Sequence, residues 1–423
     1  MNRAARPSRL HPSLGLTLAL TLAACSGGDD GASSASSSTT TTAAETGTTS
    51  AGSTTSTSGE TTAASESEGT SGGDEGRTEG CDGAPLLPVP ADPALRGPWA
   101  VGARTVTIAD RTTEIWYPAA PGAEAGKEPA IYDIRLHLPA EEQGKIPDEA
   151  NPWQACDCYR DLPIDAAHGP YPVIVFIHGT AGFRTQSLTF MTHWASRGFV
   201  VVSSDHTGIT LGDVLSGNFG ADQAGDAGKV LDALATPSGE VAFLAGRIDM
   251  GRVGMAGHSA GGSAISGFGG RPGVQVLAPM AAGGASPGAA LKSTLVLGGM
   301  VDKIVAYGSQ QSGYAGSAPR KRLVGLTTAG HLAFSDLCVL GAEQGGILQI
   351  ALDYGVNVPP LLIPLAKDGC GPENLSPEAG FEITNAASAA AFEEILHCDA
   401  AMTEALAALP GRFPAIGEYQ EAL

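Results

Sequence analysis

Between residues 173 and 326 the sequence alternates short apolar runs with segments of helical periodicity. The run Val173–Ile177 is apolar throughout, which is typical of a strand buried on both faces of a parallel sheet. Further strands are expected at Phe199–Val202, Val253–Ala256, Val274–Leu277, Ser293–Leu297 and Arg322–Leu326. Helices are expected at Gln186–Arg197, at about Asp226–Leu234 and after Ser259. This alternation predicts an α/β fold with a mostly parallel central sheet and helices on both faces.

Three other segments flank or interrupt this alternation. Residues 104–117 alternate apolar and polar side chains around a turn-like Ala-Asp, which predicts a hairpin. Residues 124–169 are polar and contain prolines, and the region after Asp336 mixes apolar runs with cysteines before a helical segment at 385–409. We expect these two irregular regions to form lid or rim elements, because open α/β sheets bind ligands beyond the carboxyl ends of their strands.

The first 80 residues differ in composition from the rest of the chain. Residues 26–80 contain 38 Ser, Thr or Gly in 55 positions. They therefore have too few apolar side chains to offset the entropy cost of ordering the chain. They predict a disordered linker rich in Ser, Thr and Gly. Residues 81–423 are then expected to form one folded domain, with residues 337–423 as a helical, cysteine-containing extension.

The start of the chain has the features of an export signal. Arg3, Arg6 and Arg9 precede an apolar run at Leu14–Ala24, which is too short to cross a bilayer. The run continues into Cys25 as Leu-Ala-Ala-Cys and resembles the lipobox of bacterial lipoproteins. The resemblance implies a signal peptide within residues 1–25, acylation of Cys25, and a domain anchored to the outer membrane or cell surface. An ordinary secretory signal is the alternative.

The overall composition excludes several classes of protein. A formal net charge of −20 argues against nucleic-acid binding, because an acidic surface repels phosphate groups. A hydrophobic content of 43% excludes a wholly disordered chain. We expect a monomer that needs no cofactor.

Six cysteines remain after Cys25, and an even number in an exported domain predicts disulfide bonds. They are Cys81, Cys156, Cys158, Cys338, Cys370 and Cys398. Their pairing stays open, but a bond between Cys156 and Cys158 would close a very small ring, so each is expected to pair elsewhere. A metal site is the alternative, but Cys-Asp-Cys without a further CxxC or histidine partner has poor spacing for zinc. No metal is therefore expected.

The strongest candidate for a nucleophile is Ser259. It lies in Gly-His-Ser-Ala-Gly at 257–261, which matches the G-x-S-x-G motif of a strand-to-helix turn that exposes a serine oxygen. Two other matches surround Ser71, in the expected linker, and Ser286, which precedes a proline that has no N–H for an oxyanion. Only Ser259 follows an apolar strand and precedes a helix start.

A serine nucleophile needs a base and an acid that orients the base, and in this strand-to-helix arrangement the chain order is Ser, acid, His. Asp302 follows the strand expected at 293–297, and His331 follows the strand expected at 322–326. A helix-capping Asp and a solvated His are the alternatives for each position alone. Order and placement together predict a triad of Ser259, Asp302 and His331. The other histidines lack this order or setting: His11, His137, His168, His178, His193, His206, His258 and His397.

The loop after the first buried strand, His-Gly-Thr-Ala-Gly-Phe at 178–183, can supply a second part of the site. Its glycines allow the backbone to approach a substrate closely. We expect an oxyanion hole made by the backbone N–H groups of Thr180 and Ala260. Phe183 and His258 are candidates for the substrate pocket.

Together these residues resemble the α/β-hydrolases. They are similar to the branch of platelet-activating-factor acetylhydrolase-like and dienelactone-hydrolase-like esterases and of bacterial cutinases or polyester hydrolases. The similarity extends from about residue 97 to 336 and rests on segments at 116–118, 170–185, 197–206, 248–262 and 330–336. Acetylhydrolase-like members carry the acid after the strand that follows the nucleophile helix, where this chain has no carboxylate. The acid at Asp302 is in the cutinase-like position.

The resemblance implies a serine esterase that hydrolyses carboxylic esters through an acyl-enzyme. An amidase or thioesterase with the same triad is an alternative, because the nucleophile motif does not encode the leaving group. A catalytically inactive surface binding module is another.

Overall fold

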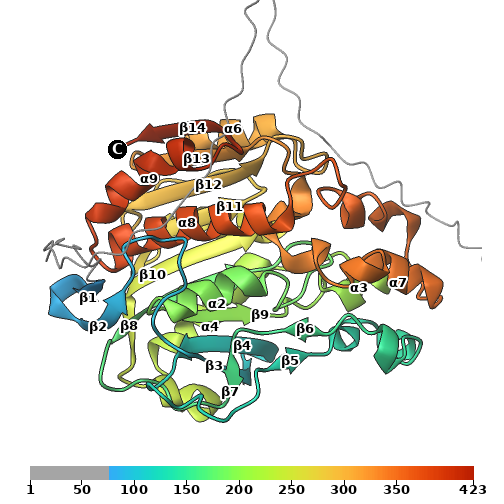
Figure 1. The fold of residues 1–423 in the computed structure, drawn as a ribbon, viewed down its shortest axis with the longest axis horizontal. Coiled ribbons are helices and arrows are strands. Elements are labelled where there is room, and N and C mark those ends of the chain that lie inside the picture. The colour runs from blue at the N-terminus through green and yellow to red at the C-terminus, as the bar shows by residue number, and fades with distance from the viewer. Residues whose placement is uncertain (1–75) are drawn as a thin grey trace, which may run out of the picture. The chain divides into compact units, whose positions relative to one another are not determined.

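A 10-stranded sheet forms the centre of the protein, whose computed structural model describes residues 76–423 (Figure 1). The expected signal peptide, Cys25 and nearly all of the expected linker lie outside the described residues. The strand order across the sheet is β14-β13-β12-β11-β10-β8-β9-β4-β3-β7. The six strands from β13 to β9 in this order run parallel, as the sequence predicts.

The six parallel strands coincide closely with the expected apolar runs, and β3 and β4 form the expected hairpin. Two small two-stranded sheets are also present. The central strands are β3 (Val101–Ile108), β4 (Arg111–Pro118), β7 (Tyr159–Arg160), β8 (Tyr171–Ile177), β9 (Val200–Ser204), β10 (Ile248–His258), β11 (Val274–Met280), β12 (Ser293–Gly299), β13 (Lys321–Leu326) and β14 (Ile416–Ala422). The small sheets pair β1 (Arg77–Glu79) with β2 (Pro85–Val89), and β5 (Ile131–Tyr132) with β6 (Gln154–Ala155). Strand β1 lies inside the range expected for the linker.

Helices cover both faces of the sheet. Side chains of α2 (Leu188–Ser196), α8 (Pro377–Leu396) and α9 (Ala401–Arg412) share one core cluster, and side chains of α4 (Gln223–Ala235) belong to another. Successive side chains of β12 point to opposite faces of the sheet. Leu295 and Leu297 pack in the first cluster, whereas Val296 packs against Tyr314 of α6 (Tyr307–Gly316). The remaining helices are short: α1 (Ala140–Gln143), α3 (Leu211–Leu215), α5 (Ala260–Ala264) and α7 (Ile347–Asp353). This arrangement confirms the predicted α/β fold.

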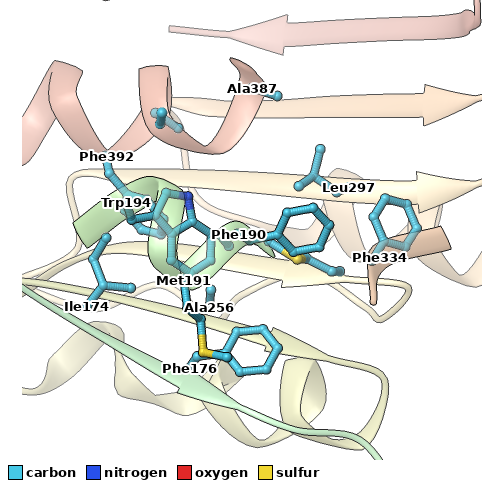
Figure 2. Close-up of a cluster of buried hydrophobic side chains, with 14 of the residues drawn as sticks. Ile174, Phe176, Phe190, Met191, Trp194, Ala256, Leu297, Phe334, Ala387 and Phe392 are labelled. Carbon is cyan, nitrogen blue, oxygen red and sulfur yellow. The ribbon is translucent and has the colours of Figure 1, made fainter. Parts of the chain in front are cut away.

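The C-terminal extension is part of the core rather than an appendage on it. Trp194 of α2 packs edge-on against Phe392 of α8, with ring centroids 5.3 Å apart, and its indole N–H donates to Ser388 Oγ at 2.9 Å (Figure 2). Small buried side chains at 386–391, which are alanines except for Ser388, let α8 approach the sheet closely. Strand β14 then extends the sheet by antiparallel pairing with β13. The segment from α8 to β14 therefore stabilises the fold directly.

Three disulfides confirm the prediction of oxidised cysteines but correct one pairing. They join Cys81 to Cys398, Cys156 to Cys158, and Cys338 to Cys370. The expectation that Cys156 and Cys158 pair elsewhere is wrong. The N–H of Cys156 donates to the carbonyl of Ala130, and the carbonyl of Cys158 accepts from the N–H of Ala130. These bonds bend the chain and hold the two Cα atoms 5.0 Å apart, within the range that a disulfide spans.

Disulfides of this kind are typical of exported proteins, because reducing compartments keep thiols free. Within residues 76–423, no helix has both the length and the apolarity needed to cross a bilayer.

Candidate active site

Ser259 occupies a strained turn between β10 and α5. Its backbone angles are φ 55° and ψ −117°, in a region that side-chain-bearing residues rarely adopt. A Cβ on Gly261 would lie 2.1 Å from the carbonyl oxygen of Ile177, and a Cβ on Gly257 would lie 2.5 Å from Gly261. Only glycine fits these two positions. The two glycines therefore allow the start of α5 to pack closely against β8, with Ser259 at the turn between β10 and α5.

The competing serines have no such setting. Ser71 lies outside the described residues. Ser286 lies in the irregular segment between β11 and β12, and its N–H donates to the carbonyl of Ser266 at 2.8 Å. No helix follows Ser286 before β12.

Asp302 and His331 meet at the carboxyl ends of neighbouring strands. Gly299 of β12 is in register with Leu326 of β13, so the loops that follow these strands lie side by side. The Nδ1 atom of His331 lies 2.9 Å from Asp302 Oδ2, and both side chains are fully buried. Donation from Nδ1–H to the carboxylate leaves Nε2 as the proton-accepting nitrogen.

The carboxylate of Asp302 is itself held in place. Its Oδ1 accepts the N–H groups of Ile304 and Val305, each at 2.8 Å, and its Oδ2 accepts from Gln310 Nε2 at 3.2 Å. The Nε2 atom of His331 has no hydrogen-bond partner among residues 76–423 and lines the same pocket as Ser259. The base is therefore oriented by its acid and keeps one nitrogen available.

His258, expected as a pocket residue, lines the pocket but also connects the parts of the site. Burial lowers the pKa of His258 to about 3, so its ring is neutral. The Nε2 of His258 is 2.9 Å from the carbonyl oxygen of His331, and its Nδ1 is 2.8 Å from Gln186 Nε2. Gln186 also accepts the N–H of Gly179 through Oε1, at 3.3 Å. The nucleophile turn, the histidine loop and the glycine loop are thus hydrogen-bonded through one neutral imidazole.

Asp368 is a residue of the site that the sequence analysis missed. Its Oδ2 accepts hydrogen bonds from the N–H groups of His331 at 2.9 Å and Lys303 at 3.0 Å, and its carbonyl accepts from Leu332 N–H at 2.9 Å. It therefore joins the acid loop to the histidine loop. It stands in a polar Lys-Asp-Gly-Cys loop and its partners lie 37 and 65 residues away, so no local pattern could have identified it.

The two backbone groups expected to form an oxyanion hole lie on adjacent strand ends. Ile177 of β8 is in register with Gly257 of β10, which brings the 178–183 loop beside the nucleophile turn. The N–H of Thr180 donates no hydrogen bond within residues 76–423. Ala260 is the first residue of α5, and N–H groups in the first helical turn have no partner inside the helix. Both groups can therefore donate to a ligand.

A largely apolar pocket opens beside Ser259. Thr180, Phe183, His258, Ser259 and His331 all line it, so most of the residues selected from the sequence share one cavity. The rest of its wall comes from the two irregular regions expected as rim elements and from the segment around α3. Figure 1 shows α3 and α7 together at the end of the sheet where the parallel strands finish.

Two further buried histidines lie in or beside the glycine loop, and neither is hydrogen-bonded to an acid within the described part of the chain: His178 Nδ1 is 2.8 Å from the carbonyl oxygen of Gly179, and His206 Nδ1 is 3.7 Å from Asp226 Oδ2. Burial lowers the pKa of His178, whose Nε2 accepts the N–H of His206 at 3.0 Å. Burial also lowers the pKa of His206 to about 2. Both are therefore neutral.

Comparisons with known proteins agree with this fold. Residues 162–269, which include the glycine loop and Ser259, match the family model described as Chlorophyllase. The structure is similar to that of a ferulic acid esterase from Streptomyces cinnamoneus, with 20% sequence identity, a TM-score of 0.50, and coverage of 73% of this chain and 92% of the esterase. No curated protein matches the sequence. The strand order, the turn at Ser259 and this structural likeness show that the protein has the α/β-hydrolase fold.

Proposed function

We propose that the protein is a serine esterase that hydrolyses carboxylic esters through Ser259, His331 and Asp302. One observation carries the proposal: a serine in a strained strand-to-helix turn shares a pocket with a histidine whose other nitrogen is bonded to a buried carboxylate. A strained backbone and a buried histidine–carboxylate pair both lower the stability of a fold. Such features are concentrated at functional sites. The likeness to esterases favours an ester as substrate.

In the first half of the reaction, Ser259 Oγ attacks the ester carbonyl carbon while its proton moves to His331 Nε2. Asp302 stabilises the imidazolium that results and keeps the ring in the productive orientation. The N–H groups of Thr180 and Ala260 donate to the oxyanion, and each such donor contributes about 3 kcal/mol in serine hydrolases. The bond from the carbonyl carbon to the alkoxy oxygen then breaks, and the proton passes from His331 to the leaving alcohol.

In the second half, water replaces the alcohol. His331 takes a proton from the water, the resulting hydroxide attacks the acyl carbon, and Ser259 leaves with the proton returned from His331. The products are one carboxylic acid and one alcohol, and the enzyme is regenerated. Each of these steps uses only groups of this chain and water.

Two other functions share parts of this site. An amidase or thioesterase would use the same nucleophile and base with a different leaving group. A binding module would keep the pocket without turnover, but the bonded His331–Asp302 pair and the strain at Ser259 would then have no use.

The location of the enzyme is also part of the proposal. We infer that the domain is exported and anchored through acylated Cys25, with the linker separating it from the membrane, and that it acts as a monomer. The three disulfides support export.

Kinetics of triad variants of the full chain test the proposal. Ser259→Ala and Asp302→Asn should lower kcat for p-nitrophenyl acetate by at least about a thousandfold, as in other serine hydrolases. Ser286→Ala, in the competing motif, should have wild-type activity. Amide and thioester analogues of the acetate, measured in parallel, should be turned over more slowly than the ester. Full activity of Ser259→Ala would refute the proposal.

A further inference from the structure

We propose that the pocket beside Ser259 holds an aliphatic hydrocarbon chain of the substrate ester. This inference rests on the proposed esterase function and specifies its substrate class. The pocket wall comes mainly from three segments outside the strands of the central sheet. These segments are residues 134–152, residues 211–215 in α3, and residues 337–366 after the histidine loop.

Most side chains of the wall are aliphatic. Phe183 is the one aromatic residue among those lining the described pocket. The larger aliphatic side chains include Ile134, Leu211, Leu215, Ile350, Val356 and Leu362. Branched aliphatic groups on several sides match the shape of a flexible methylene chain, whereas a flat aromatic ring is commonly held by stacking on other aromatic rings.

Most polar groups of the wall already have hydrogen-bond or ion-pair partners within the protein. Thr180, Gln186, His258, Ser259 and His331 belong to the reaction site and its hydrogen bonds. Away from it, the guanidinium of Arg135 pairs with Asp133 and Asp148, each at 2.7 Å. Asn151 donates to Asp133 Oδ1 at 2.8 Å, while its own Oδ1 is buried without a partner among residues 76–423. The cavity therefore has the reaction site at the serine and, apart from Arg135 and Asn151, an apolar wall elsewhere.

The third segment is fixed to the catalytic loops at its base. The disulfide between Cys338 and Cys370 closes a ring around nearly the whole segment. Asp368, which lies two residues after the segment and inside this ring, binds both catalytic loops. This part of the pocket wall is therefore connected directly to the loops that carry His331 and Asp302. The same segment also exposes large apolar side chains outside the pocket, as does the first segment, which suits the approach of an apolar substrate. The exposed residues are Leu136 in the first segment, Trp153 directly after it, and Leu352, Tyr354 and Leu361 in the third segment.

The catalytic efficiency, kcat/KM, should therefore increase as the hydrocarbon chain of the substrate becomes longer. Burial of one methylene group favours binding enough to raise kcat/KM by about threefold to fourfold. We expect this gain for each added methylene from acetate upward until the pocket is filled. Hydrocarbon can enter on the acyl or the alcohol side of the ester.

The experiment measures kcat/KM with the full chain for two ester series below their micellar concentrations. One series lengthens the acyl group of p-nitrophenyl esters from acetate to octanoate, and the other lengthens the alcohol of alkyl acetates over the same range. A rise in either series supports the proposal and identifies the side that enters the pocket. Flat profiles in both series, with measurable turnover of p-nitrophenyl acetate, would overturn the proposal while leaving the esterase function intact. No turnover of any ester would overturn both.

Variants of two small wall residues link the selectivity to the pocket. Ala351→Trp in α7 and Ala366→Phe fill the cavity from partly exposed positions that can tolerate a larger side chain. Each should lower the ratio of octanoate to acetate kcat/KM by at least about tenfold, the loss of roughly two buried methylene groups. Ala342→Trp, in the same segment but exposed and outside the pocket wall, should keep the wild-type ratio. Wild-type ratios in both pocket variants would contradict the proposal.

Discussion

The backbone N–H of His331 donates a hydrogen bond to the Asp368 carboxylate at 2.9 Å. The same carboxylate oxygen accepts the N–H of Lys303, the residue after Asp302. One buried side chain therefore fixes the spacing between the proposed base and the proposed acid, although it belongs to neither of their loops.

Removal of this carboxylate should impair turnover more than binding. We expect Asp368→Ala to lower kcat about tenfold to a hundredfold with little change in KM, because misplacement of a catalytic group by about 1 Å has effects of this size. Asp368→Asn keeps an acceptor oxygen and should be closer to wild type. Asp353→Ala, an exposed acid on α7, is the matched control. Equal kcat values for the Asp368→Ala and Asp353→Ala variants would show that Asp368 does not position the site.

The disulfide at the base of the pocket segment should contribute measurably to stability. Cys338 and Cys370 are 32 residues apart, and closure of a loop of this length stabilises a fold by about 3 to 4 kcal/mol in the chain-entropy model. The double variant Cys338→Ser/Cys370→Ser should lose about this much free energy of unfolding. The measurement is urea unfolding followed by circular dichroism.

The disulfide between Cys156 and Cys158 provides an internal comparison. It closes only a very short ring, so replacement of both cysteines by serine should destabilise the fold less. A larger loss from this pair than from the 338–370 pair would contradict the loop-closure argument.

Asp336 should make stability depend on pH. It is buried, accepts hydrogen bonds from Thr189 N–H and Gln154 Nε2 at 3.1 Å each, and its pKa is raised by burial to about 7. An exposed Asp has a pKa of about 3.9, so between about pH 4 and 7 the folded state binds more protons than the unfolded state. The stabilisation from this proton is complete below about pH 4 and is lost as the pH rises through 7.

Replacement of Asp336 by Asn removes the titrating group and keeps its shape. The free energy of unfolding of Asp336→Asn, relative to wild type, should increase with pH by up to about 1.4 kcal/mol per unit between about pH 4 and 7. Chemical unfolding at half-unit pH steps measures the difference. A constant difference across this range would mean that Asp336 is charged throughout.

Much of the fold was predictable from the sequence because its central strands are buried on both faces. All seven residues of β8 are buried, so the apolar run could not belong to an exposed element. The turn at Ser259 was recognisable because its strand, its glycines and its helix start are contiguous. Strand β14 was not predicted, because an edge strand needs few apolar residues and its sequence, Ile-Gly-Glu-Tyr-Gln-Glu-Ala, is mainly polar.

The features that could not be predicted from the sequence depend on contacts between distant segments. The roles of Asp368 and Gln186 are visible only when loops that are far apart in the sequence meet. The bond between Cys156 and Cys158 depends on a local bend that Ala130 imposes from another segment. Sequence periodicity carries no information on such contacts.

The most direct test of the central claim is mass spectrometry of the full chain after reaction with a p-nitrophenyl alkylphosphonate. The reagent transfers its phosphonyl group to the activated serine and releases p-nitrophenol. The account predicts one phosphonyl group per chain, on the peptide that contains Ser259, and no labelling of the Ser259→Ala variant. Stoichiometric labelling of another serine, or equal labelling of Ser259→Ala, would contradict it.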